Sequence, residues 1–461
     1  SNIKPVFLGI NFFGNFKNYL KSLAIVFYFL TKIKRIRKSN LKKYKIGLLT
    51  WSTALEIDDN NIKEGTGLNA VIPKNFNPKE VLIYSKTNIS KKYQLKAKNN
   101  NYDFVDFSKK GIFKYSSFND ILNLLKFFIN LKYKFILDGL SPDPLLVDEY
   151  PKIIYFYLQW NKFVNTYYFD ISISYNEYSL SDLIRNKVFL TKNIKCWSYA
   201  HSASDYYLYN SEFSSDPSKS FISYSRKYFL LKDQINFFRS SKVYSEKNIL
   251  VGPLFKTYKS GLLLTKTNQK KIIISIFPCS INSNSFNPIS AEKKFFEELF
   301  TLISKSSDEY FYIIKGKSNK FNKDNYKNLI EVEDSICKKE NNYVFISPNT
   351  PSFKIINKSD LIISMAFTSP TIEALSTGKP AVFFDPQRSA NNNHFKKING
   401  IYINNIIDLA NFIESIKDKK TLIKWLSVTK EKIGLDENNE GIYNIHKDIE
   451  DFFVKDKNVI K

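Results

Sequence analysis

The feature that most limits the fold of this 461-residue chain is a series of short apolar segments separated by segments with helical spacing. Short apolar runs bounded by polar residues are typical of buried strands. The candidate strands are 45–50, 80–84, 134–137, 168–174, 196–200 and 248–251 in the first half, and 271–277, 310–315, 343–346, 361–364 and 381–385 in the second. Because strands that alternate with helices form parallel βαβ units, the pattern predicts an α/β fold with two Rossmann-like, doubly wound domains.

A polar stretch rich in Lys and Thr, residues 258–270, separates the two halves. With this stretch as the boundary, we expect a basic and apolar N-terminal segment at 1–44, one Rossmann-like domain at 45–257, a second at 271–435 and a C-terminal helix at 436–461. Ligands of open parallel sheets bind beyond the carboxyl ends of the strands. Two such domains that face each other would therefore form a cleft in which the chemistry takes place.

The formal net charge of +25 suits nucleic acid, an anionic membrane surface or phosphorylated small molecules as partners. Lysines are dispersed along the whole chain, and no zinc-finger, RNA-recognition or helix-turn-helix signature is present. We therefore do not expect specific nucleic-acid binding. The chain has only 3 Cys and 3 His, far apart, and no strand-end DxD motif, so we expect a reducing compartment and no metal.

Residues 23–30 (LAIVFYFL) form an apolar run that is followed by a cluster of Lys and Arg. The run is too short to cross a bilayer, and its charges follow the apolar core, unlike those of a secretory signal. Two interpretations stay open: a packing helix with a solvated basic end, or an interfacial segment held by anionic lipid. We expect a cytoplasmic protein whose residues 23–43 are the candidate contact with the inner membrane face.

The stretch ISMAFTSPTIEALSTGKPAVFFDP, residues 363–386, joins two predicted strands through a hydroxyl-rich turn and a short helix. Ser369 can cap this helix, with Pro370 at its first position. Free backbone N–H groups and the positive end of the helix dipole would then form an anion site suited to phosphate. An ordinary strand–helix–strand unit with a good cap is the alternative interpretation.

Several side chains near this helix start could bind the rest of a nucleotide. Ser364 and Thr368 add hydroxyl groups, and Glu373, one turn into the helix, could hold a ribose diol. Lys315 and Lys317 lie at the end of the strand 310–315, where a lysine can neutralise charge on a leaving phosphate. In a chain so rich in lysine, their position could also be chance.

The segment FTSPTIEALSTGKPAVFFDP resembles the donor-binding segment of GT-B glycosyltransferases, most closely bacterial surface-carbohydrate biosynthesis proteins of the capsule and O-antigen type. The resemblance implies that Thr368 and Ser369 contact the donor phosphate and that Glu373 contacts the ribose. It also implies that the second domain binds the nucleotide donor and the first binds the acceptor.

Residues 174–202 resemble an N-domain segment of the same proteins, in which a carboxylate precedes an Arg-containing helix and a His follows the next strand. The corresponding residues here are Glu177, Arg185 and His201. A third similarity, at 248–255 (NILVGPLF), marks the end of the first domain.

Transfer from a nucleotide sugar requires a base that accepts a proton from the acceptor hydroxyl. Glu177 and His201 are the two candidates, although a first-turn Glu and a loop His can also be purely structural. Arg185, Asp138 and Asp385 are further candidate substrate contacts, with turn and packing roles as the alternatives.

The sequence thus predicts a metal-independent glycosyltransferase without a cofactor beyond its nucleotide-sugar substrate. It would transfer a sugar to a surface polysaccharide or a lipid-linked glycan acceptor. The hydroxyl-rich turn suggests, by resemblance, a CMP-activated acidic sugar as donor, with UDP- and GDP-sugars as open alternatives. Three alternatives stay open: a CDP-polyol phosphotransferase of the teichoic-acid type, a nucleotide-sugar epimerase, and a non-enzymatic basic nucleic-acid-binding protein.

Overall fold

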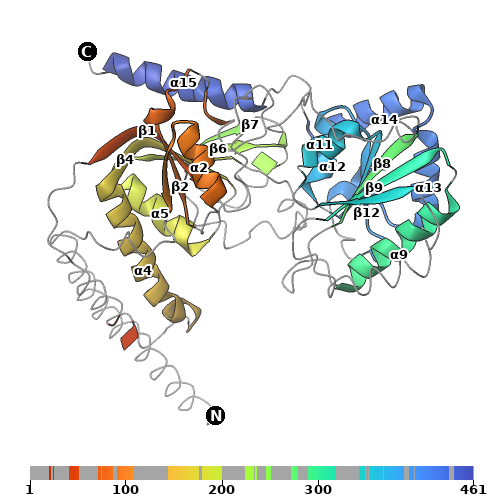
Figure 1. Cartoon of the computed structure of the whole chain (residues 1–461), viewed down its shortest axis with the longest axis horizontal. Coiled ribbons are helices and arrows are strands. Elements are labelled where there is room, and N and C mark those ends of the chain that lie inside the picture. The colour runs from red at the N-terminus through yellow and green to blue at the C-terminus, as the bar shows by residue number, and fades with distance from the viewer. Residues whose placement is uncertain are drawn as a thin grey trace, which may run out of the picture.

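The computed structural model describes the two sheets of the protein and the helices around them (Figure 1). The described residues are 20, 21, 24, 41–50, 71–73, 75–86, 91–106, 144–175, 179–199, 224–232, 234–235, 245–250, 271–278, 289–306, 308–316, 342–347, 350, 352–366, 368–388, 394–398, 400–435 and 441–459. Among them, no helix is long and apolar enough to span a bilayer.

The first sheet has seven strands in the order β3-β2-β1-β4-β5-β6-β7, and every neighbouring pair is parallel. Its strands are β1 (Lys42–Thr50), β2 (Val81–Ser85), β3 (Asp103–Asp106), β4 (Tyr167–Tyr175), β5 (Lys195–Tyr199), β6 (Tyr224–Phe229) and β7 (Ser245–Leu250). Its helices include α2 (Lys91–Asn99), α4 (Pro144–Thr166) and α5 (Leu180–Leu190).

The second sheet has six parallel strands in the order β10-β9-β8-β11-β12-β13. Its strands are β8 (Ile272–Phe277), β9 (Tyr310–Lys315), β10 (Tyr343–Ile346), β11 (Leu361–Met365), β12 (Ala381–Phe384) and β13 (Tyr402–Ile403). The helices are α9 (Ile289–Lys305), α11 (Ser352–Lys358), α12 (Ser369–Ser376), α13 (Ile406–Ser415) and α14 (Lys419–Lys432).

The strand order of each sheet reverses at one place, between β1 and β4 in the first and between β8 and β11 in the second. At such a switch point the two connections leave in opposite directions, which opens a crevice at the carboxyl ends of the strands. The two faces of the second sheet are covered separately. Helix α9 packs on one face, and α11 and α12 pack on the other.

The last helix, α15 (Gly441–Val459), follows the second domain in sequence but packs on the first sheet (Figure 1). Its Ile445 and Ile449 are fully buried in the hydrophobic cluster that contains Trp197 of β5. Its Asp448 pairs with Arg226 of β6, whose guanidinium carbon lies 4.3 Å from the ring centre of Trp197. The end of the described chain thus completes the core of the first domain.

The two parallel sheets confirm the predicted fold class, and most predicted strands coincide with observed ones. The predicted strand 134–137 and the proposed connector 258–270 lie outside the described residues. The domain limits inferred from the sequence therefore stay a proposal.

Candidate functional site

The start of α12 lies at the carboxyl edge of the second sheet, directly after β11. The helix begins at Ser369, so its N-cap is Thr368, with φ −80° and ψ 143°, and Pro370 is its second residue. The prediction that Ser369 caps the helix is therefore wrong by one residue. The Thr368 hydroxyl does not cap it either, because it donates to the carbonyl oxygen of Met365 at 3.2 Å. Within the described residues, no side-chain hydrogen bond caps this helix start, which leaves its N–H groups suited to an anion.

Two buried hydroxyl groups adjoin this helix start without a hydrogen-bond partner in the described part of the chain. They belong to Ser364 of β11 and Thr371, the third residue of α12, both 0% exposed. Successive side chains of a strand point to opposite faces of the sheet. Ile363 and Met365, the neighbours of Ser364, point to the face that α9 covers, so Ser364 points to the face that α12 covers. Buried hydroxyls without partners are costly, and a ligand that hydrogen-bonds to them would remove this cost.

Lys315 and Glu373 come from separate elements but lie within electrostatic reach of each other. Lys315 ends β9, is almost fully buried, and donates from Nζ to the carbonyl oxygen of Gly316 at 3.2 Å. Glu373 of α12 is only partly exposed. Burial raises the pKa of Glu373 to about 7, although the positive charge of Lys315 opposes this shift. The structure therefore brings together five predicted donor-site residues: Lys315, Ser364, Thr368, Ser369 and Glu373.

Asp385 follows β12 at the same edge of the sheet and is held by a tyrosine. Its Oδ2 accepts a 2.6 Å hydrogen bond from the hydroxyl of Tyr402. Burial, together with this hydrogen bond, raises the pKa of Tyr402. The contact gives Asp385 a structural role, while a contact with substrate stays a prediction.

Close by in the sequence, Gln387 donates from Nε2 to Oγ of Ser290 at 3.0 Å, which joins the segment after β12 to the start of α9.

Glu292 lies in the first turn of α9 and was not expected from the sequence to be a site residue. It is 8% exposed, and burial raises its pKa to about 7. One sequence signal could have identified it. Glu292 shares the apolar stripe of its helix with Phe296 and Leu299, so an acidic residue occupies a position that the periodicity assigns to the core.

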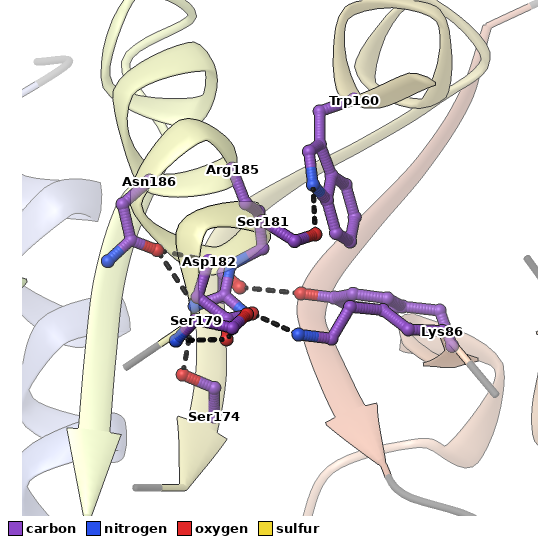
Figure 2. Close-up of polar contacts among 10 residues, drawn as sticks. Lys86, Trp160, Ser174, Ser179, Ser181, Asp182, Arg185 and Asn186 are labelled. Carbon is purple, nitrogen blue, oxygen red and sulfur yellow. Dashed lines mark hydrogen bonds and ion pairs between the residues drawn. The ribbon is translucent and has the colours of Figure 1, made fainter. Parts of the chain in front are cut away.

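A network of buried charges lies at the carboxyl edge of the first sheet (Figure 2). Asp182 of α5, 1% exposed, forms ion pairs with Lys86, which directly follows β2, and with Arg185 Nη1 at 3.3 Å. Its Oδ2 also accepts hydrogen bonds from the backbone N–H of Ser179 at 3.3 Å and from its hydroxyl at 2.5 Å. Arg185 Nη2 in turn donates to Oγ of Ser174, near the end of β4, at 3.2 Å. Together, Asp182 and Arg185 thus join the end of β2, β4 and the start of α5.

The remaining hydrogen bonds of the Arg185 guanidinium stay inside the protein. Nε and Nη2 donate to Oδ1 of Asn186 at 3.1 and 2.8 Å, and the side chain is 1% exposed. This burial favours a positioning role for Arg185 over a direct contact with substrate. Lys86 reaches further toward solvent, with 19% of its side chain exposed.

Four predicted site residues lie outside the described residues: Asp138, Glu177, His201 and Lys317. Their roles stay predictions. Within the described ranges, no group of three or more His, Cys, Asp or Glu could hold a metal ion.

Comparison with known proteins gives a family and a fold. A family model described as "Polysaccharide biosynthesis PFTS motif protein" matches residues 125–413. The chain reads AFTS at 366–369, which agrees with three of the four letters in that description. A search of curated proteins found no match.

Two solved structures are similar along nearly the whole chain. HepE from Anabaena, in complex with UDP and glucose, has a TM-score of 0.52 at 10% identity, covering 89% of this chain and 100% of HepE. The UDP-GlcNAc 2-epimerase from Neisseria meningitidis, bound to UDP-GlcNAc, has a TM-score of 0.52 at 12% identity, covering 90% and 100%. At such identities the likeness concerns the fold alone, and it agrees with two Rossmann-like domains of the GT-B type.

Proposed function

This chain belongs to the family of polysaccharide biosynthesis PFTS motif proteins, and from that premise we propose that it is a GT-B glycosyltransferase. It transfers a sugar from a nucleotide-activated donor to a growing surface polysaccharide or a lipid-linked glycan, in the assembly of a capsule or O-antigen. The observation that carries the proposal is the start of α12. Within the described residues this helix end has no side-chain cap, and the buried hydroxyls of Ser364 and Thr371 beside it have no hydrogen-bond partner.

We assign the donor phosphates to this helix start, where backbone N–H groups and the helix dipole favour an anion. Lys315 lies at the same sheet edge and would neutralise charge on the leaving nucleotide. Glu373 would accept hydrogen bonds from the ribose hydroxyls. Lys317 would contact the donor phosphates beside Lys315. On the acceptor side, Glu177 or His201 would act as base, and Asp138 is a further candidate substrate contact.

The donor nucleotide has more than one candidate class. The resemblance of the hydroxyl-rich turn suggests a CMP-activated acidic sugar. UDP- and GDP-sugars are the other candidates, and the two proteins of similar fold described above were each solved with UDP or a UDP-sugar, which supports the UDP class. A CDP-polyol phosphotransferase would use the same phosphate site and would differ by its response to CDP.

A nucleotide-sugar epimerase is the second candidate function, because one protein of similar fold and equal TM-score is an epimerase. The two functions differ in their need for an acceptor. Incubation with a nucleotide sugar alone, followed by chromatography, would give an epimeric nucleotide sugar from an epimerase. A transferase would leave the donor unchanged apart from slow hydrolysis.

The binding site is tested with Ser364→Ala in the full chain. Removal of a buried hydroxyl without a partner leaves stability unchanged or raises it, whereas the affinity for nucleotide falls, by about tenfold for one lost hydrogen bond to a charged group. The matched control is Ser275→Ala on β8, whose hydroxyl pairs with that of Ser359 at 2.5 Å. This control loses about 1 kcal/mol of stability and keeps its nucleotide affinity.

The readouts are thermal unfolding and calorimetric titration with CMP, CDP, UDP and GDP. At least one nucleotide is expected to stabilise the wild-type protein and to bind Ser364→Ala more weakly. If none of the four binds the wild-type protein, the transferase proposal fails. Equal affinities of the wild-type protein and Ser364→Ala would show that the phosphate site lies elsewhere.

We also propose that residues 23–43 bring the protein to the inner face of the membrane. Apolar insertion combined with basic residues is a sufficient anchor on anionic lipid. Co-flotation with vesicles of anionic lipid, lost with neutral lipid, is the expected result. Equal recovery from both would contradict it.

A further inference from the structure

Glu292 is a buried acid that has no role in the proposed phosphate site. It lies on the same face of α9 as Phe296, Leu299 and Ile303, which pack against β8, β11 and β12 in the core. Its side chain therefore faces the sheet. More than nine-tenths of Glu292 is buried, and no described residue gives it a hydrogen bond or an ion pair.

The other glutamates of this helix lie in ordinary surroundings. Glu297 and Glu298 are partly exposed and pair with lysines one turn earlier, Lys293 at 3.9 Å and Lys294 at 2.8 Å. Glu292 instead carries the free-energy cost of a buried carboxyl, visible in its raised pKa. An apolar side chain would fill the same position without this cost, so a polar ligand at Glu292 explains its presence better than packing does.

The position of Glu292 adjoins the switch point of the second sheet. Helix α9 follows β8, and α12 follows β11, the two strands between which the strand order reverses. The first turn of α9 is joined to the segment after β12 by the hydrogen bond from Gln387 to Ser290. Glu292 therefore lies on the side of the crevice toward β12, on the sheet face opposite to α12.

The two arms of a nucleotide sugar extend in opposite directions from its phosphates. With the phosphates at the start of α12, Glu373, which lies within electrostatic reach of Lys315 at the end of β9, would hold the nucleoside arm on the β9 side. The other arm, which carries the sugar, then extends toward β12 and the first turn of α9. Resting on the proposed function, we propose that Glu292 is a specificity-determining residue of the donor site, which hydrogen-bonds to hydroxyl groups of the transferred sugar.

The chemistry of a carboxyl group suits this role. In its protonated form it both donates and accepts a hydrogen bond, which matches a sugar hydroxyl, and in its ionised form it accepts two or more. An ionised Glu292 would repel the carboxylate of an acidic sugar. A neutral, hydroxylated sugar is therefore the expected transferred group.

The test compares each nucleotide with its own sugar derivative by calorimetric titration of the full chain. The probes are UDP with UDP-glucose and UDP-GlcNAc, GDP with GDP-mannose, and CMP with CMP-N-acetylneuraminic acid. The variants are Glu292→Ala and Glu292→Gln, with Glu297→Gln on the same helix as the matched control. The pair that binds the wild-type protein most tightly is used for all variants.

The expected result is a change confined to the sugar. Glu292→Ala binds the nucleotide sugar about tenfold more weakly and binds the nucleotide itself within about twofold of wild type. Glu292→Gln keeps most of the affinity, because an amide also donates and accepts, and Glu297→Gln behaves as wild type. Unchanged binding of the nucleotide sugar by Glu292→Ala overturns the inference, as does the acidic sugar being the preferred ligand.

Failure of the proposed function looks different, because no nucleotide would then bind the wild-type protein at all. Circular dichroism shows whether Glu292→Ala folds. If it does not fold, Glu292→Gln decides the question at pH 6 and pH 8. The ratio of wild-type to Glu292→Gln affinity changes with pH for the nucleotide sugar. The same ratio stays constant for the nucleotide itself, because ionisation of its terminal phosphate affects both proteins equally. A ratio that stays constant with pH for the nucleotide sugar as well overturns the inference.

Discussion

The pH dependence of stability is a direct consequence of the burial of Glu292. Its pKa is about 7 in the folded protein against an ordinary value of 4.5. The folded state therefore binds this proton more tightly than the unfolded state does. The stabilisation is fully present below about pH 4.5, decreases as the pH rises, and is lost above about pH 7. Glu292→Gln places a neutral side chain of nearly the same shape at this position and removes the effect.

The magnitude follows from the two pKa values. A difference of one between the folded and unfolded pKa values corresponds to about 1.4 kcal/mol of stability. The whole stabilisation that is lost between low and high pH is therefore about 3 kcal/mol. Between pH 5.5 and pH 8.0, about 2 kcal/mol of this is lost. A domain of roughly 150–250 residues changes its melting temperature by about 2–4 °C per kcal/mol of stability. The melting temperature of the wild-type protein should therefore fall by about 4–8 °C relative to that of Glu292→Gln over this pH interval.

The assay is thermal unfolding of both proteins at the two pH values, without ligand, followed by circular dichroism. The quantity of interest is the change in the difference between the two proteins. Glu373, whose pKa is also about 7, contributes equally to both and cancels, as does any pH-independent effect of the amide. A difference that stays constant within about 1 °C would refute the reasoning, since Glu292 would then titrate as an ordinary surface carboxyl.

Three further predictions concern other parts of the structure. Asp182→Asn leaves the buried charge of Arg185 without its carboxylate and should cost about 3–5 kcal/mol in urea unfolding; an unchanged midpoint would contradict the network. Gly400→Ala should destabilise by at least about 2 kcal/mol, because φ is +82° and the new Cβ would lie 2.8 Å from Nε1 of Trp425; a wild-type melting temperature would show that this turn adapts. Glu373→Ala should weaken nucleotide binding about tenfold at pH 7, and unchanged affinity by calorimetry would mean that the ribose lies elsewhere.

Local patterns in the sequence were sufficient to predict the strands at the centre of each sheet. These are apolar, short and bounded by polar residues, which is how a strand buried on both faces reads. Strand β6 was missed because it contains Arg226 and Lys227, which a local reading assigns to solvent. In the structure Arg226 is satisfied by Asp448, 222 positions later in the chain, so no window around β6 contains the reason for its burial.

The same distinction applies to the candidate site. Hydroxyl residues after a strand and before a helix predicted an anion site at the start of α12, and the structure places them there. The pairing of Lys86 with Asp182 joins residues 96 positions apart, and the burial of Glu292 depends on a sheet assembled from distant segments. Contacts of this kind are set by topology, which the local pattern does not contain.

The return of α15 to the first sheet has a consequence for biosynthesis. During translation the first sheet is complete long before residues 441–459 leave the ribosome. Until then the apolar surface that Ile445 and Ile449 cover, which includes Trp197, is open to solvent. A nascent first domain would therefore expose this apolar surface to chaperones and neighbouring chains while the second domain is being synthesised. Synthesis of residues 441–459, and not completion of the first sheet, becomes the step at which the first domain can reach its folded state.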